Sequence, residues 1–220
     1  MGMKLHELHP ALIHAPLTVL PAAAAVDLVA AATCDRGMSR LGGTLWSLGA
    51  GAGLIAGLAG MAASQEVSTQ DRRVSDAMYL HGIGNLGLVV AASGMALWRM
   101  RRPAGITSAV VGLIATGSAL YTAYLGGELV YGSGLGVKGM SERARAGASK
   151  DVPEVLSPGA PARFVRDAVK GLGWLLRRTY QLLSGEQPFD RRAFSLGKQA
   201  NGVTSPPPLA PRREPVRPIT

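Results

Sequence analysis

Long apolar stretches alternate with short polar segments over residues 1–131 of the chain. Four stretches of 22 or 23 residues stand out: 11–33, 41–63, 77–98 and 106–127. Together they contain one formally charged side chain, Asp27. Because about 20 apolar residues are enough to cross the hydrocarbon core as a helix, each stretch is predicted to be a transmembrane helix. The loops between them have 7 to 13 residues, so the pattern predicts an all-α, integral membrane four-helix bundle with antiparallel neighbours.

Small residues mark one face of the second stretch. Gly49, Gly53 and Gly57 recur every four residues, which places them on one side of a helix and lets a neighbouring backbone approach closely. The ridge is predicted to pack inside the bundle, with a homo-oligomer interface as the alternative.

The second part of the chain differs in charge. Residues 1–131 hold 8 Lys/Arg against 7 Asp/Glu, a net charge of +1, whereas residues 132–220 hold 15 against 7, a net charge of +8. The later part also holds 10 of the 14 prolines. A basic region often signals nucleic acid, but no nucleic-acid recognition module is visible, and no nucleic-acid partner is predicted.

The basic part divides into three segments after a four-span domain at residues 1–140. Residues 141–162 are rich in Gly, Ser, Pro and charge and are predicted to be a linker. Within residues 163–184, apolar side chains recur at helical spacing beside basic ones. This pattern predicts a C-terminal amphipathic helix that lies on an anionic membrane surface or packs on its own bundle. Residues 185–220, Pro- and Arg-rich, are predicted to be a disordered tail.

Loop charge bears on orientation in the cell membrane. Two short loops on one side carry most of the arginines near the spans: Arg36, Arg40, Arg99, Arg101 and Arg102. Basic loops favour the cytoplasmic side, so the N-terminus is predicted to lie outside, although the basic tail argues for the opposite orientation.

Histidines gather at one membrane face. His9 opens the first span, and His14 and His81 lie about one turn into the first and third spans, which run in the same direction. Glu128 and Tyr131 follow the fourth span on the same face. Ionisable groups inside spans are costly, which makes this cluster a candidate functional site.

Two imidazoles at matched depth can ligate a haem iron axially or share another metal. His14 and His81 are the predicted metal pair, and Asn85, one turn beyond His81, is placed to orient a ring nitrogen. His9, Glu128 and Tyr131 complete the candidate cofactor site. Spacing leaves haem b, zinc and a proton-handling pair open, as well as plain interfacial packing. The single cysteine excludes an internal disulfide framework, a thiolate zinc site and a Cys-ligated iron–sulfur cluster.

Asp27 lies roughly 20 Å beyond His14 along the helix axis, toward the opposite face. It is predicted to pair with Arg36, Arg40 or Arg99, or to be protonated. A proton or ion pathway from Asp27 to the histidines is a further alternative.

Two motifs resemble a known family. The segment His9-Pro10-Ala11-Leu12-Ile13-His14-Ala15-Pro16 resembles the opening His-Pro-x-x-Val-His-Phe-Pro signature of a bacterial membrane family called domain of unknown function 2231. The segment Leu125-Gly126-Gly127-Glu128-Leu129-Val130-Tyr131 looks like the end of that domain, and His81 matches its third-span histidine. The resemblance covers about residues 5–140. Ala15 departs from it, because Phe is usual there.

The resemblance implies a four-span domain without a settled activity, in which the matched His, Gly, Glu and Tyr residues matter. Some relatives look as though they continue into redox domains, which favours a redox role. The leading hypothesis is haem b binding for electron transfer, with a redox partner protein. The alternative is a non-enzymatic membrane scaffold or interaction subunit that contacts the lipid bilayer.

Overall fold

The structure, a computed structural model, describes residues 5–67, 69–135 and 154–194. Its helices in chain order are α1 (Leu5–Leu12), α2 (His14–Thr33), α3 (Arg36–Ala63), α4 (Arg72–Arg99), α5 (Ile106–Gly127), the π-helix η1 (Glu128–Gly132) and α6 (Ala160–Leu183). Among the described residues, four helical segments are long and apolar enough to cross a membrane. The prediction of an all-α, four-span bundle with a C-terminal helix is therefore confirmed.

Two aspartates explain why α3 and α4 begin before their apolar stretches. Asp35 caps α3 by accepting a hydrogen bond from the Met38 amide at 2.8 Å. Asp71 caps α4 in the same way, with the Arg73 amide at 2.8 Å. Such caps satisfy backbone N–H groups that have no partner inside the helix. Each cap therefore starts a helix in the polar region, five residues ahead of the apolar stretch.

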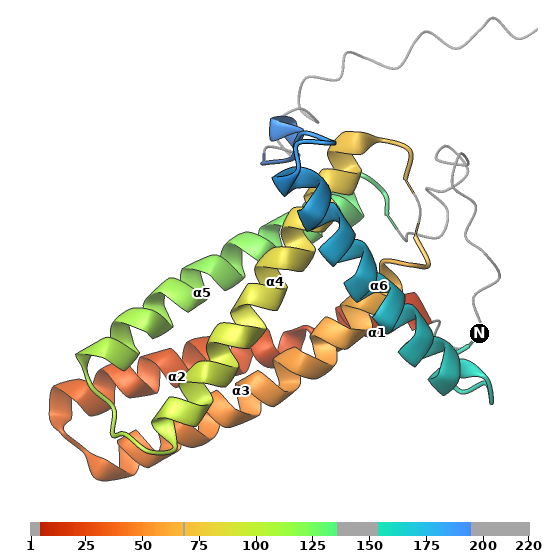
Figure 1. The fold of residues 1–220 in the computed structure, drawn as a ribbon. Coiled ribbons are helices and arrows are strands. Elements are labelled where there is room, and N and C mark those ends of the chain that lie inside the picture. Colours follow the sequence, from red (N-terminus) through yellow and green to blue (C-terminus); the bar gives the residue numbers. More distant parts are fainter. Residues whose placement is uncertain (1–4, 68, 136–153, 195–220) are drawn as a thin grey trace, which may run out of the picture.

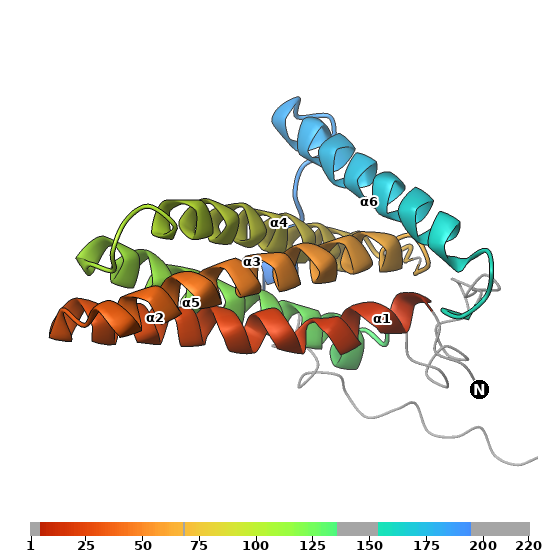
Figure 2. The same cartoon turned by 90° about the horizontal axis from the view of Figure 1, so that it is seen from below.

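The first span is interrupted at Ile13, which separates α1 from α2. Pro10 and Pro16 flank the interruption, and proline has no N–H to continue a helical ladder. Two backbone bonds still bridge it, from Ile13 N to the His9 carbonyl at 3.1 Å and from Leu17 N to the Ile13 carbonyl at 3.2 Å. As a result, α1 and α2 follow one another along nearly the same line (Figure 2).

In the bundle, α2 and α4 each pack against both α3 and α5, so they stand diagonally across from one another (Figure 1). Small residues allow this close packing. A Cβ added at Gly112 of α5 would lie 2.7 Å from the Ala24 Cβ of α2. Gly49 faces Leu20, and Gly53 faces Val89, inside the bundle. The glycine ridge of α3 therefore serves packing within one chain.

A buried ion pair joins the helices at the end where α2 and α4 finish. Asp27, fully buried, accepts hydrogen bonds from the Arg99 Nε at 2.9 Å, the Arg99 Nη2 at 3.0 Å and the Trp46 Nε1 at 3.0 Å. A Cβ at Gly42 would lie 2.1 Å from the Asp27 Oδ1, so a glycine is needed there. Of the three arginines considered as partners, the structure selects Arg99. Together with the Trp46 bond, the Arg99 bonds give both carboxylate oxygens of Asp27 a hydrogen-bond partner, as a buried polar group requires.

At the opposite end, α6 crosses α3 and α4 at a steep angle (Figures 1 and 2). Gly171 lets the two backbones touch, since a Cβ there would lie 2.2 Å from the Met61 carbonyl oxygen. Arg178 of α6 forms a buried ion pair with Asp76 of α4 at 2.6 Å. Tyr79 adds a hydrogen bond to Thr179 at 3.0 Å. One face of the C-terminal helix therefore packs on its own bundle.

The chain remains folded for a short distance after α6. Phe189 and the fully buried Ala193 pack against Val74 and Leu129, and the Asp190 amide donates to Asp76 at 2.9 Å. Residues 185–194 thus differ from the disordered tail predicted from residue 185, because Asp76 and an apolar cluster hold them in place. Residues 195–220, which include the triple proline, lie outside the described residues. Most of the predicted linker does too.

Candidate functional site

A cavity of about 520 Å³ opens at the end of the bundle that α6 crosses, and most of its wall is apolar. We call it the histidine cavity. Its polar and aromatic lining residues are Glu7, His9, His14, Ser64, His81, Asn85, Tyr131 and Trp174. Leu175 of α6 also lines it, and a Cβ at Gly82 would lie 3.0 Å from the Leu175 Cδ2. The wall therefore draws on both the spans and α6.

His9 is fixed by α3. Its Nδ1 lies 2.8 Å from the Ala56 carbonyl oxygen. A carbonyl oxygen only accepts, so the ring proton is on Nδ1 and the Nε2 lone pair is left available. The ring also lies against Gly60, where an added Cβ would be 3.0 Å from the His9 Cε1 and Nδ1 atoms. A larger residue at position 60 would displace the ring.

His81 is held in the same tautomer by α5. Its Nδ1 lies 2.8 Å from the Thr122 carbonyl oxygen, so Nδ1 is the donor and Nε2 an acceptor. Asn85 Nδ2 lies 2.9 Å from the His81 carbonyl and 3.2 Å from the His81 Nε2. The carbonyl contact identifies that atom of the amide as the nitrogen, because two acceptors would repel. Asn85 Oδ1 in turn accepts from the Thr122 hydroxyl at 3.1 Å.

The imidazole rings of His9 and His81 lie edge to face. The ring centroids of His9 and His81 are 6.1 Å apart, and the ring planes meet at 83°. Because α1 and α4 lie on opposite sides of the bundle, this contact crosses its interior. Gly126 of α5 closes the other side of His81, since a Cβ there would lie 2.8 Å from the His81 Cε1.

The remaining predicted site residues lie further from this pair. His14 lines the cavity but is exposed, and the structure gives it no contact with His81. Tyr131 also lines it, at 83% exposure. Glu128 lies outside the lining, with its Oε2 folded over Gly132. In the described segments, no three His, Cys, Asp or Glu side chains are grouped closely enough to hold a metal ion. The His6 side chain lies outside the described residues.

Sequence reasoning missed two groups that shape the site. Thr122 and Gly60 support the two imidazoles from α5 and α3, yet neither residue type signals such a role by itself. The available signal was the four-residue spacing of Thr122 and Gly126, which places them on one face of a helix, together with a histidine in another span. The π-helix η1 was also missed. It widens the backbone directly after Gly126 and Gly127, and π-turns of this kind are frequent at functional sites.

Four spans, two facing imidazoles in one tautomer and an apolar cavity define a multi-pass helical membrane protein with an internal histidine site. The family model described as predicted membrane protein (DUF2231) matches residues 5–139, and the chain belongs to that family. The match ends shortly after η1 and leaves α6 outside it. No curated protein and no solved structure matches the chain.

Proposed function

We propose that the histidine cavity binds haem b, that His9 and His81 would hold its iron, and that the protein transfers electrons at one membrane face to a redox partner protein. The observation that carries the proposal is the facing pair of imidazoles across an apolar cavity. Histidine is a common ligand of haem iron in proteins. The sequence alone favoured His14 as the partner of His81, whereas the geometry favours His9.

The donor set fits the group in three respects. Imidazole nitrogens bind metals at about 2 Å, and the His9 and His81 ring centroids are 6.1 Å apart, so both rings would be within reach of one iron. Both histidines donate Nδ1–H to a backbone carbonyl, the usual support of a metal-ligating imidazole. The lining is mostly apolar, and a low-polarity shell of this kind sets the potential of a bound haem.

A bound haem b supplies a one-electron carrier. The chain's own residues do the rest: Ala56 and Thr122 orient the rings through their carbonyls, and Gly60 and Gly126 leave room for those rings. Asn85 occupies His81 Nε2 and keeps its bond to the His81 carbonyl when Nε2 is used as a ligand. Trp174 and Leu175 of α6 complete the wall of the cavity.

The test is a difference spectrum of the full chain, expressed with haem supplied, purified in detergent and measured oxidised and dithionite-reduced. Reduced haem b bands are expected for the unchanged protein. His9→Gln and His81→Gln should abolish them, whereas His14→Gln, an equal change at an exposed position, should leave them unchanged. Absence of haem bands from the unchanged protein would overturn the proposal. Elemental analysis for iron and zinc on the same sample separates haem from a zinc site.

One observation favours a second candidate, a scaffold or interaction subunit without a cofactor. His81 already has a partner at both ring nitrogens, Thr122 at Nδ1 and Asn85 at Nε2, and edge-to-face contact of two rings at this separation is ordinary packing. On this alternative, His81→Gln keeps the fold and the complexes that the protein forms, and iron and zinc are both absent from the purified protein.

A further inference from the structure

Helix α6 carries three different faces. The first packs on the bundle through Gly171, Leu175 and Arg178. The second is an apolar stripe that stays exposed in the structure: Val165, Val169, Leu172, Leu176, Tyr180 and Leu183. The third is a basic stripe of Arg166, Lys170 and Arg177, also exposed.

Helical geometry sets the three faces in order around the axis. At about 100° per residue, the apolar stripe is centred about a third of a turn from the packed face, and the basic stripe follows it by a similar angle. Exposure along the apolar stripe ranges from 38% at Leu172 to 83% at Leu183. Monomeric soluble proteins rarely leave a continuous apolar stripe of this length in water.

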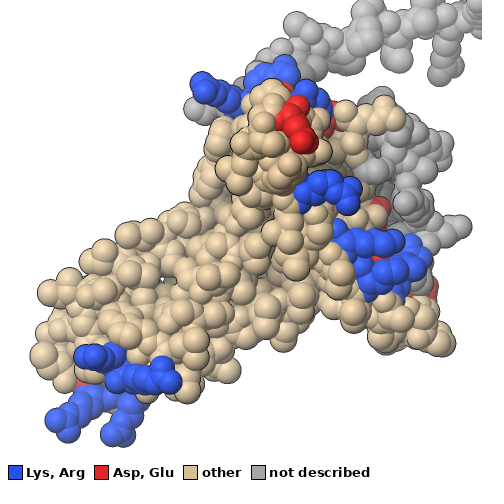
Figure 3. Space-filling view, in the orientation of Figure 1, with Lys and Arg blue, Asp and Glu red and all other residues tan. Residues whose placement is uncertain are grey.

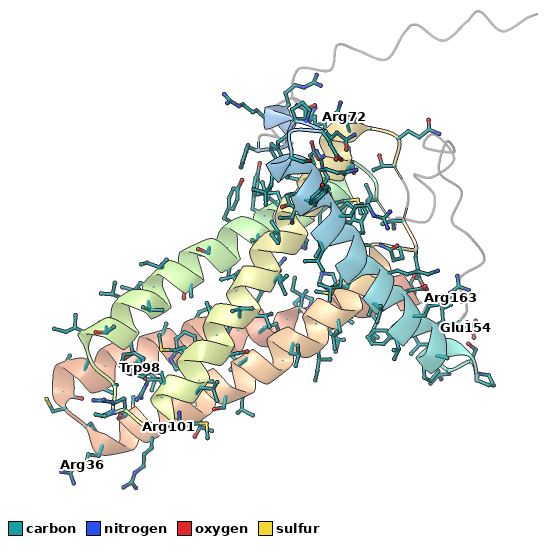
Figure 4. The ribbon with its side chains drawn as sticks, in the orientation of Figure 1. Arg36, Arg72, Trp98, Arg101, Glu154 and Arg163 are labelled. Carbon is teal, nitrogen blue, oxygen red and sulfur yellow. The ribbon has the colours of Figure 1, made fainter. Side chains whose placement is uncertain are left out.

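The position of α6 indicates what covers its apolar stripe. The helix crosses the bundle where α3 ends and α4 begins (Figures 1 and 2). Those are the termini of membrane-spanning helices, so α6 lies at the level where the bilayer surface meets the bundle. Basic side chains gather over α6 as well as at the far end of the spans (Figure 3), and Figure 4 places Arg163 at the α6 end and Arg36 and Arg101 at the far end.

We infer that α6 is an interfacial helix whose apolar stripe inserts into the surface of an anionic phospholipid bilayer while its basic stripe contacts the lipid phosphates. A helix with an apolar face beside a basic face binds anionic membrane surfaces in this way. The charge next to the stripe selects lipid over a protein partner, and the lipid contact is continuous with that of the spans. The inference is independent of any cofactor in the histidine cavity.

The test places a polarity-sensitive fluorophore on single cysteines in the full chain, reconstituted in nanodiscs, with Cys34→Ser as background. A label at Leu176→Cys reports on the apolar stripe, and a label at Lys170→Cys, on the exposed basic stripe, is the matched control. In nanodiscs of phosphatidylcholine with phosphatidylglycerol, the label at 176 should be blue-shifted and quenched by lipids carrying a shallow nitroxide. The label at 170 should stay accessible to a water-soluble quencher.

The charge contribution is tested separately. Arg166→Gln, Lys170→Gln and Arg177→Gln together should reduce quenching at 176 to the level seen in pure phosphatidylcholine. The matched control removes three exposed arginines at the end of the bundle away from α6, by Arg36→Gln, Arg40→Gln and Arg101→Gln. Quenching of the label at 176 should then be unchanged. Added salt should reduce quenching at 176 in the unsubstituted α6 as the triple change does, because screening weakens exposed charge interactions. This measurement does not depend on the folding of the triple variant.

Three outcomes would overturn the inference. In the first, the label at 176 is water-accessible in nanodiscs with and without phosphatidylglycerol. In the second, its quenching is independent of anionic lipid and of salt. In the third, the stripe is shielded in native membranes but not in pure lipid, which identifies a protein as its occupant.

Discussion

The protons on His9 and His81 are placed by their neighbours. Each Nδ1 faces a backbone carbonyl, of Ala56 and Thr122 respectively, so each Nε2 carries a lone pair, which at His81 accepts from Asn85. The sequence places all four histidines at one membrane face, and this could be predicted from their depth in the spans. Which imidazole faces His81 could not be predicted, because it depends on how the segment before Ile13 is rotated about the interruption of the first span.

Gly126 is the residue on which the position of His81 most directly depends. Gly126→Ala is expected to destabilise the protein by about 1–3 kcal/mol, because the new methyl group overlaps the His81 ring. Thermal unfolding in detergent measures the cost. Gly127→Ala is the matched control, since a Cβ there meets nothing within 4 Å, and it should be neutral or stabilising by up to about 1 kcal/mol. Equal effects at both positions would contradict the geometry.

Asp27 gives a second prediction on single residues. Asp27→Asn leaves the Arg99 guanidinium buried without its carboxylate, and breaking a buried pair from one side costs about 3–5 kcal/mol. Asp35→Asn removes the same charge from an exposed helix cap, where Asn serves as well as Asp. Unfolding measurements should therefore show a large loss of stability for the first variant and little change for the second. A small loss for both would show that the pair is dispensable.

Among the elements, the spans were the most predictable, whereas η1 was missed and the surroundings of α6 were left open. Apolar length fixed the four spans, and capping by Asp35 and Asp71 accounts for the earlier starts of α3 and α4. For α6, periodicity indicated a helix but left two surroundings open, the membrane surface and the bundle. Its docking depends on Gly171 meeting the Met61 carbonyl and on Arg178 meeting Asp76, contacts between distant parts of the chain that periodicity does not encode.

Arg178 is predicted to hold α6 on the bundle. Arg178→Met leaves Asp76 buried without its cation, so amide hydrogen exchange across α6 should accelerate, by up to the equivalent of about 3–5 kcal/mol. Arg177→Met, the adjacent and exposed position, should leave exchange unchanged. If exchange in α6 is already fast in the unchanged protein, the docked arrangement is not its resting state.

At the scale of the whole molecule, the loop charges predict an orientation in the membrane. The structure removes Arg99 from the loop charges that favour a cytoplasmic location, because Asp27 neutralises it inside the bundle. Arg36, Arg40, Arg101 and Arg102 remain exposed at that end and still favour it. On this basis, the N-terminus and α6 are predicted to lie outside the cell membrane.

Cys34 allows a direct measurement of that orientation. It is the chain's single cysteine and is exposed between α2 and α3. A membrane-impermeant maleimide added to intact cells should not label it, and labelling should appear after permeabilisation. Ser184→Cys on a Cys34→Ser background, exposed at the α6 end, should label without permeabilisation. The reverse pattern would place the N-terminus inside.

The ion pair between Asp76 and Arg178 also implies an order of events during synthesis. Asp76 precedes Arg178 by 102 residues. A chain is synthesised N-terminus first, at about 5–20 residues per second. The carboxylate that anchors α6 is therefore in place several seconds before its partner exists. The α3–α4 surface forms first, and α6 docks last on a completed membrane domain. Truncation before α6 would leave Asp76 hydrated at the bilayer surface, with the spans already inserted.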